Sequence, residues 1–153
     1  NQLARCVPAL EPGTAILYEE PFIPAFPANS LAALLNWTYD PDNHGQAFSY
    51  DILRISERLG NELPALELDL PIRHGNFTGS TSRVLAVTLD EQGCLQILRP
   101  ADKHNQDLPL LLRQAARISN PGRVIRGSSP SAQPPPFMTS FDRDVDCPCD
   151  SFY

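Results

Sequence analysis

Alternating hydrophobic and polar positions predict several strands in the middle of the chain. From Leu66 to Ile72, leucine and isoleucine alternate with Glu67 and Asp69, which is the two-residue period of a half-buried strand. Residues 83–89 and 94–98 form two more apolar runs. The turn sequence between them ends in Gly93, placed for a positive φ, so we predict a β-hairpin there.

Helical spacing of apolar residues predicts two helices in the first half of the chain. Residues 31–36 follow Asn29 and Ser30, either of which can cap a short helix. Residues 50–59 follow Ser49 and place apolar side chains at positions 52, 55 and 59, on one helical face. We also expect the β-prone run at residues 14–18 to be extended.

A third helix is predicted over residues 108–118, where leucine, alanine and isoleucine form one apolar stripe. Asp107 is its expected cap, and Pro109 falls in the first turn, where a missing N–H is harmless. Residues 123–126 are predicted to be a last short strand. From Arg83 to Ser119, the hairpin followed by a helix loosely resembles the carboxy-terminal domain of TonB-type proteins, and we carry no function across from that family.

Proline divides the chain into three parts. Twelve of the 16 prolines lie toward its ends, six up to Pro41 and six from Pro121 onward. Proline fixes φ and removes a backbone donor, so long helices are excluded there. We therefore expect an extended Pro-rich arm over residues 1–30 and a single α+β core over 31–126. That core would hold a small, mostly antiparallel sheet with about three short helices. A Pro/Ser-rich tail over 127–153 ends in Cys-Pro-Cys.

The two arms carry large apolar side chains in segments with little predicted secondary structure. Such side chains are typical anchors of protein interfaces, and those of the first arm could also add a strand to a sheet. Docking on the same chain and docking on a neighbouring copy both remain open. The expected anchors are Tyr18, Phe22, Ile23, Phe26, Phe137, Phe141, Phe152 and Tyr153.

Charge and hydropathy exclude two classes of partner. The net charge of −6 repels phosphate backbones, so nucleic acid is not an expected partner. No run of about eighteen apolar residues occurs, so no membrane span is expected.

Four cysteines and two glycosylation sequons favour a secreted or cell-surface protein. We expect two disulfides, with Cys6 and Cys94 as the partners of Cys147 and Cys149; the alternative is four free thiols, with Cys94 as a small buried hydrophobe. The sequons begin at Asn36, near a predicted helix end, and at Asn76, in a Gly/Ser/Thr-rich loop.

One loop has the spacing of a calcium site. Asp40, Asp42 and Asp51 fall at the first, third and twelfth positions of an EF-hand-type loop, and Gly45 falls at the sixth. The segment after Asp51 resembles the helix that follows this loop in dockerin modules, which implies calcium binding. The alternative is a turn-rich connection in which Asp and Asn bind backbone groups.

No catalytic motif occurs, so an enzyme is not expected. The leading hypothesis is a non-catalytic extracellular assembly subunit whose arms dock on neighbouring copies in a ring or filament. Deleting residues 1–27 would then leave a folded monomer. The alternative hypothesis is a monomeric, secreted binding module or inhibitor, stapled by disulfides, with calcium-dependent docking as a variant.

Overall fold

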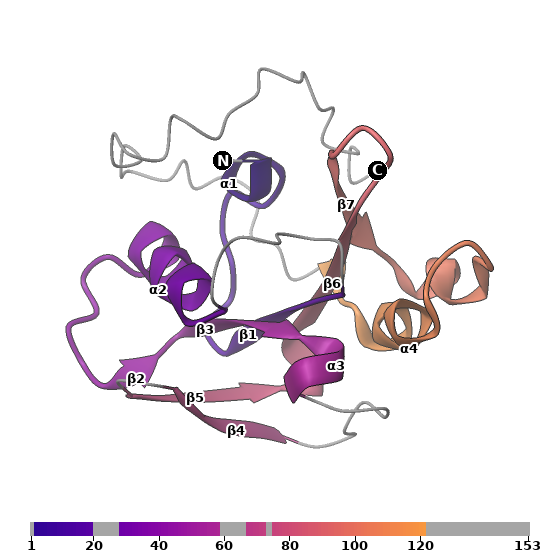
Figure 1. Cartoon of the computed structure of the whole chain (residues 1–153). Helices are drawn as coiled ribbons and strands as arrows, with labels where there is room; N and C mark the ends of the chain where they lie inside the picture. The colour runs from indigo at the N-terminus through magenta and orange to yellow at the C-terminus, as the bar shows by residue number, and fades with distance from the viewer. Residues whose placement is uncertain (1, 20–27, 59–66, 73–74, 122–153) are drawn as a thin grey trace.

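The computed structural model describes residues 2–19, 28–58, 67–72 and 75–121. Within them the chain forms an α+β fold with two mixed sheets (Figure 1). The elements in chain order are α1 (Gln2–Cys6), β1 (Thr14–Tyr18), α2 (Ala28–Tyr39), β2 (Ala47–Phe48), β3 (Tyr50–Arg54), α3 (Ile55–Arg58), β4 (Glu67–Ile72), β5 (Gly75–Ser80), η1 (Thr81–Arg83), β6 (Val84–Leu89), β7 (Leu95–Leu98), η2 (Pro100–His104) and α4 (Leu110–Ile118).

The larger sheet has four strands in the order β3-β1-β6-β7. Strand β1 pairs in parallel with β3 on one side and with β6 on the other, and only β6 and β7 pair antiparallel. Between β1 and β3 the chain passes through α2, the kind of crossover that parallel neighbours need. The predicted mostly antiparallel sheet is wrong, because three of the five strand pairings in the described residues are parallel.

The N-terminal segment belongs to the core of its own molecule. All five residues of β1 are buried, as is usual for a strand that is paired on both sides and covered on both faces. Ile16 packs toward α1 and α2, whereas Leu17 packs in the cluster that contains α4. This corrects the interpretation of residues 1–30 as an arm outside the core; residues 20–27 lie outside the described residues.

The smaller sheet has the order β2-β5-β4. Strand β4 confirms the alternating pattern, with Leu70 partly buried and Asp69 exposed. Strand β5 lies in a segment that was predicted to be a loop. The prediction is wrong because it relied on the Gly, Ser and Thr residues of the segment and did not use Phe77, which is fully buried. Glycine is required at position 75, where a Cβ would lie 1.9 Å from the Gln46 carbonyl oxygen.

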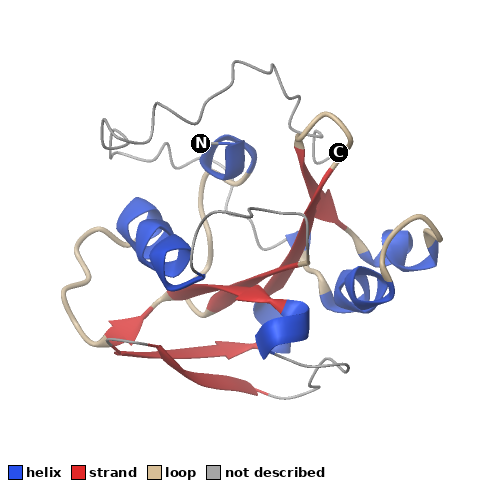
Figure 2. Cartoon of the chain, viewed as in Figure 1, coloured by secondary structure: helices blue, strands red, loops and turns tan. Residues whose placement is uncertain are grey.

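Two apolar clusters lie on the two faces of the four-stranded sheet, as Figure 2 shows by the helices on either side of the strands. The first joins α1 and α2 to the sheet, and its buried members are Cys6, Val7, Leu10, Ile16, Tyr18, Ala32, Leu35, Tyr50, Ile52, Leu85, Val87 and Leu95. The second joins α4 and β5 to the other face, and its buried members are Ala15, Leu17, Leu53, Ile55, Phe77, Val84, Ala86, Leu98, Leu112, Ala115 and Ala116.

The helix predicted over residues 50–59 is wrong. Residues 50–54 form β3, and a single helical turn, α3, follows. Ile52 packs in the first cluster and Leu53 in the second, so consecutive side chains point to opposite faces of the sheet. Pairing with the buried strand β1 outweighs the helical spacing of the apolar residues, a common result where local preference competes with tertiary contacts.

The hairpin prediction is confirmed by β6 and β7, and Gly93 has a φ of +82°. The Asp90 carboxylate accepts hydrogen bonds from the backbone N–H groups of Cys94 and Gln92. These hydrogen bonds lower the pKa of Asp90, and the bond from Cys94 has the largest effect. The turn is thus built around one carboxylate.

The two other predicted helices exist with different ends. Helix α2 is longer than expected, so Asn29 and Ser30 lie inside it. Helix α4 begins at Leu110 with Pro109 at the N-cap position, so Asp107 is not its cap. No helix of the described part is long and apolar enough to cross a bilayer. The strand predicted over 123–126 lies outside the described residues.

Candidate functional site

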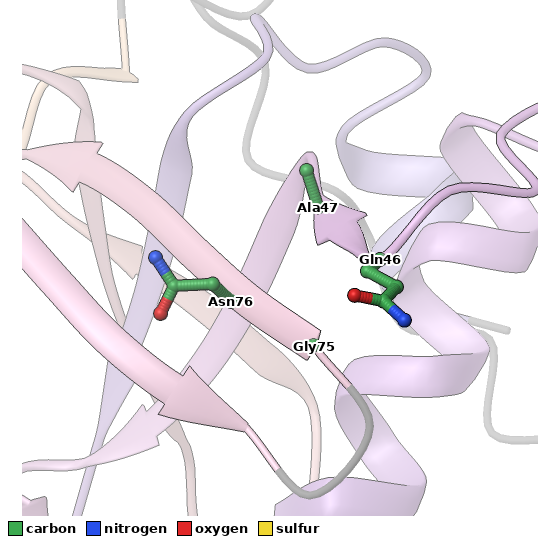
Figure 3. A pocket seen from close by; sticks show the side chains of 4 residues that line it. All are labelled: Gln46, Ala47, Gly75 and Asn76. Carbon is green, nitrogen blue, oxygen red and sulfur yellow. The ribbon is translucent and has the colours of Figure 1, made fainter.

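A shallow, open depression lies where β2 meets β5 (Figure 3). It is lined by Gln46, Ala47, Gly75 and Asn76. Ala47 pairs with Asn76 in parallel register, and the Asn76 N–H donates to the Gln46 carbonyl at 2.8 Å. Two amides, a methyl group and a glycine offer neutral donors and acceptors but no nucleophile, acid or base. This depression can hold a polar group, but its own lining cannot catalyse acid-base or nucleophilic chemistry.

Asn76, the second sequon asparagine, is exposed on the outer face of β5. Its side-chain Nδ2 donates a short hydrogen bond to Asp69 Oδ1 on the neighbouring strand β4. Thr78, the third residue of the sequon, is also exposed. Phe77 between them is fully buried, because successive side chains of a strand point to opposite faces.

Asn36, the first sequon asparagine, is buried and binds the backbone of an edge strand. Its Nδ2 donates to the carbonyls of Ala32 (2.8 Å) and Tyr50 (2.6 Å), and its Oδ1 accepts from the Tyr50 N–H at 3.0 Å. Both hydrogens of the amide are therefore used. A glycan on Nδ2 would replace one of these two hydrogens, so this packing argues against Asn36 as a glycosylation site, which stays a prediction.

Gln2 has the same role at the opposite edge of the four-stranded sheet. Its Oε1 accepts from the Leu95 N–H at 2.8 Å, and its Nε2 donates to the Gly93 carbonyl at 3.3 Å. Residues 95–98 form the edge strand β7, and residues 50–54 form the other edge, β3. Each edge thus receives a side-chain amide from a helix of the same molecule, a relation that sequence reasoning missed.

The loop proposed as a calcium site is closed by its own hydrogen bonds. The Asp40 carboxylate accepts a short bond from the Ser49 hydroxyl and a 3.1 Å bond from the Asn43 amide. The Asn43 amide also donates to the Ala47 carbonyl at 2.9 Å, and its Oδ1 accepts from the Gly45 N–H at 3.0 Å. Asp and Asn side chains that bind nearby backbone in this way stabilise turns.

The structure does not bring the three predicted calcium ligands together. Asp42 is exposed in the loop, whereas Asp51 is buried in β3, where its Oδ1 accepts from the Ile52 N–H at 2.8 Å. The described part of the chain contains no group of three or more His, Cys, Asp or Glu side chains that could hold a metal ion. The expected helix after Asp51 is a strand, so the resemblance to a dockerin loop fails at this point.

Two neighbouring tyrosines, whose ring planes are tilted by 58°, bind the segment that joins α1 to β1. The Tyr39 hydroxyl donates to the Val7 carbonyl at 2.7 Å, and the Tyr50 hydroxyl donates to the Leu10 carbonyl at 3.0 Å. Their ring centroids are 5.7 Å apart. Burial is the main cause that raises the pKa of Tyr39, and the charge of the neighbouring Tyr50 adds to it. The pKa of Tyr50 is also raised, mainly by burial and in addition by the negative charge of Asp40. Both groups hold structure in their protonated form.

Cys6 and Cys94 are both buried, at 7% and 2% exposure, and neither is a free thiol. Cys6 ends α1, whereas Cys94 lies between the β6–β7 turn and β7. Cys147 and Cys149 lie outside the described residues, so the predicted pairing of the four cysteines stays a prediction.

Of the predicted interface anchors, only Tyr18 lies in the described residues. It is buried in the first apolar cluster, which corrects its assignment as an anchor for a partner. The other seven lie outside the described residues: Phe22, Ile23, Phe26, Phe137, Phe141, Phe152 and Tyr153. Trp37 on α2, which sequence reasoning missed, is 53% exposed.

The chain was compared with family models, curated proteins and solved structures, and none of them matches it.

Proposed function

We propose that the protein is a non-catalytic, secreted binding module that works as a monomer. The observation that carries this proposal is the position of β1 in the middle of the four-stranded sheet. Ala15, Ile16 and Leu17 are paired on both sides within the same molecule. In an arm-exchange assembly, β1 would pair with strands of a neighbouring copy. Here its backbone groups already pair with β3 and β6 of the same chain.

Features of the edge strands that discourage pairing with another chain support the same proposal. Strand edges with unpaired backbone groups are templates for association. The Asn36 side chain hydrogen-bonds the N–H and C=O of Tyr50 in β3, and the Gln2 side chain accepts a hydrogen bond from the Leu95 N–H in β7. These backbone groups are therefore not available to an added strand. On the smaller sheet, edge strand β4 contains Pro71 and an exposed Asp69, both of which discourage strand addition.

The two buried cysteines support secretion. Neither Cys6 nor Cys94 is a free thiol, and disulfides persist mainly in oxidising compartments. A disulfide also restricts the unfolded chain, which stabilises the folded state.

Trp37 is the side chain we propose as the contact with a protein partner. It is the chain's one tryptophan, and it stands half-exposed on α2, the helix that covers one face of the sheet. Tryptophan is enriched at binding hot spots. Since no other tryptophan interferes, its fluorescence should shift to shorter wavelength when a partner covers it.

Sedimentation velocity of the full chain, over a wide range of concentrations, tests the monomer. We expect one species with the mass of a single chain, which is 16.9 kDa without any glycan. Growth of ring or filament species with concentration would contradict the proposal. Alkylation under denaturing conditions tests the compartment: we expect no reactive thiol before reduction and four afterwards, whereas four thiols before reduction would refute secretion.

A further inference from the structure

We infer that Asn76 is a site of N-linked glycosylation and that Asn36 is not. This inference rests on the proposed function, because only a chain in the secretory pathway meets a lipid-linked oligosaccharide donor. The two sequons are equivalent as sequence patterns. The structure separates them by burial and by the use of each amide nitrogen.

The Asn36 amide has no hydrogen left for a glycan. Its Nδ2 donates to the carbonyls of Ala32 and Tyr50, at 2.8 and 2.6 Å, and an amide nitrogen has only two hydrogens. The side chain is 8% exposed between α2 and β3. A sugar bonded to this nitrogen would break one of the two bonds and separate the helix from the edge strand.

The Asn76 amide is open on the outer face of the smaller sheet. One hydrogen of Nδ2 goes to Asp69 Oδ1, which leaves the second for substitution. Thr78 lies two residues further along β5, on the same exposed face, so both recognition side chains of the sequon point outward. A glycan here extends into solvent without moving the buried Phe77.

The covalent step is a simple substitution. The Asn76 Nδ2 forms a bond to the anomeric carbon of an oligosaccharide carried on a polyprenyl pyrophosphate. The bond between that carbon and the pyrophosphate oxygen breaks, and the polyprenyl pyrophosphate leaves with the electron pair. The amide loses one proton to a base of the transferring enzyme, so no oxidant or reductant is needed.

A glycan at Asn76 has a consequence for binding. Asn76 is one of the four residues that line the depression, with Gln46, Ala47 and Gly75 (Figure 3). A sugar on Asn76 would therefore begin at the depression. The outer face of β5 is then shielded from other proteins, whereas the exposed Trp37 on α2 stays accessible to a partner. The same glycan lies beside β4, one of the two edge strands of this sheet among the described residues.

The test is secretion of the full chain from eukaryotic cells behind a host signal peptide, with peptide mapping before and after treatment with peptide N-glycosidase. We expect one glycan, on the Asn76 peptide, and an unmodified Asn36 peptide. Thr78→Val and Asn76→Gln should each remove the glycan, whereas the matched variant Thr38→Val, which destroys the other sequon, should keep it.

A glycan on Asn36, or a secreted chain without any glycan, would overturn the inference. Mapping of the unaltered chain decides the matter even if a variant fails to fold. The host signal peptide supplies entry to the secretory pathway, so the absence of a glycan on Asn76 would contradict the glycosylation site alone. The thiol count and the sedimentation results test the proposed function separately.

Discussion

Replacing Asn36 by alanine should cost a large part of the stability of the fold. The variant removes the amide that binds the Tyr50 N–H and C=O at the edge of β3. Tyr50 is 3% exposed, so both backbone groups would be left buried without a partner. A buried polar group without a hydrogen bond costs roughly 1–3 kcal/mol. Two such groups therefore predict a loss of about 3 kcal/mol, out of the ~5–15 kcal/mol typical of a domain.

Urea unfolding followed by circular dichroism measures this loss. At this chain length, about 3 kcal/mol corresponds to a melting temperature lower by roughly 6–12 °C. The matched control is Thr38→Val, on the same helix, which loses one hydrogen bond from a half-buried hydroxyl to the Leu34 carbonyl and should change stability by about 0.5 kcal/mol or less. Equal effects of the two variants would refute the edge-binding role of Asn36.

Asn36→Asp adds a pH test of the same geometry. The new carboxylate would face the carbonyls of Ala32 and Tyr50, which the amide nitrogen now contacts. Repulsion favours the protonated acid and raises its pKa in the folded state. Protonation therefore restores stability: the contribution is fully present below the unfolded pKa of about 3.9 and is lost as the pH rises through the folded value. A variant whose stability does not fall from acid to neutral pH, relative to the unaltered chain, would contradict the donor role of Nδ2.

Three further outcomes follow from the fold. Deleting residues 1–27 removes β1 from the centre of the sheet and should abolish cooperative unfolding; a folded remainder by circular dichroism would show that the strand is dispensable. In Gly75→Ala the new Cβ would meet the Gln46 carbonyl oxygen at 1.9 Å, so urea unfolding should show a loss of about 1–3 kcal/mol, and no loss would contradict the close approach. Burial, and after it the neighbouring Tyr50, raise the pKa of Tyr39 in the folded chain. The protonated Tyr39 hydroxyl therefore stabilises the fold fully below the unfolded pKa of about 10, and this stabilisation is lost as the pH rises through the folded pKa. Tyr39→Phe should flatten the alkaline decline in melting temperature, and an unchanged decline would show that another group causes it.

The elements predicted best are those whose signals lie within a few residues of one another. The hairpin of β6 and β7 has two apolar runs around a turn that ends in Gly93, and α4 has an apolar stripe of helical period. Here the local preference and the tertiary environment agree. The helix expected at residues 50–59 failed because its apolar spacing also suits a strand, and pairing with β1 decided between them.

The candidate sites show the same limit. Sequence patterns find the sequons at Asn36 and Asn76 equally well, and the spacing of Asp40 and Asp51 equally suits a metal loop. Burial and hydrogen bonding separate these cases: one asparagine is bound to an edge strand and the other is exposed. Asp51 lies in a buried strand, away from the loop carboxylates. Such facts depend on which segments become neighbours, which no local pattern records.

By itself the sequence determined the α+β class, the hairpin, the amphipathic helix α4 and the absence of any long apolar run. It also placed β-prone residues at 14–18. The tertiary structure alone decided that these residues form the central strand of the molecule's own sheet, with neighbours drawn from residues 50–54 and 84–86. The physical reason is that a strand gains its backbone partners and most of its buried area from distant segments. The residues of β1 predict an extended conformation, and only the assembled sheet determines that the strand is buried and which strands flank it.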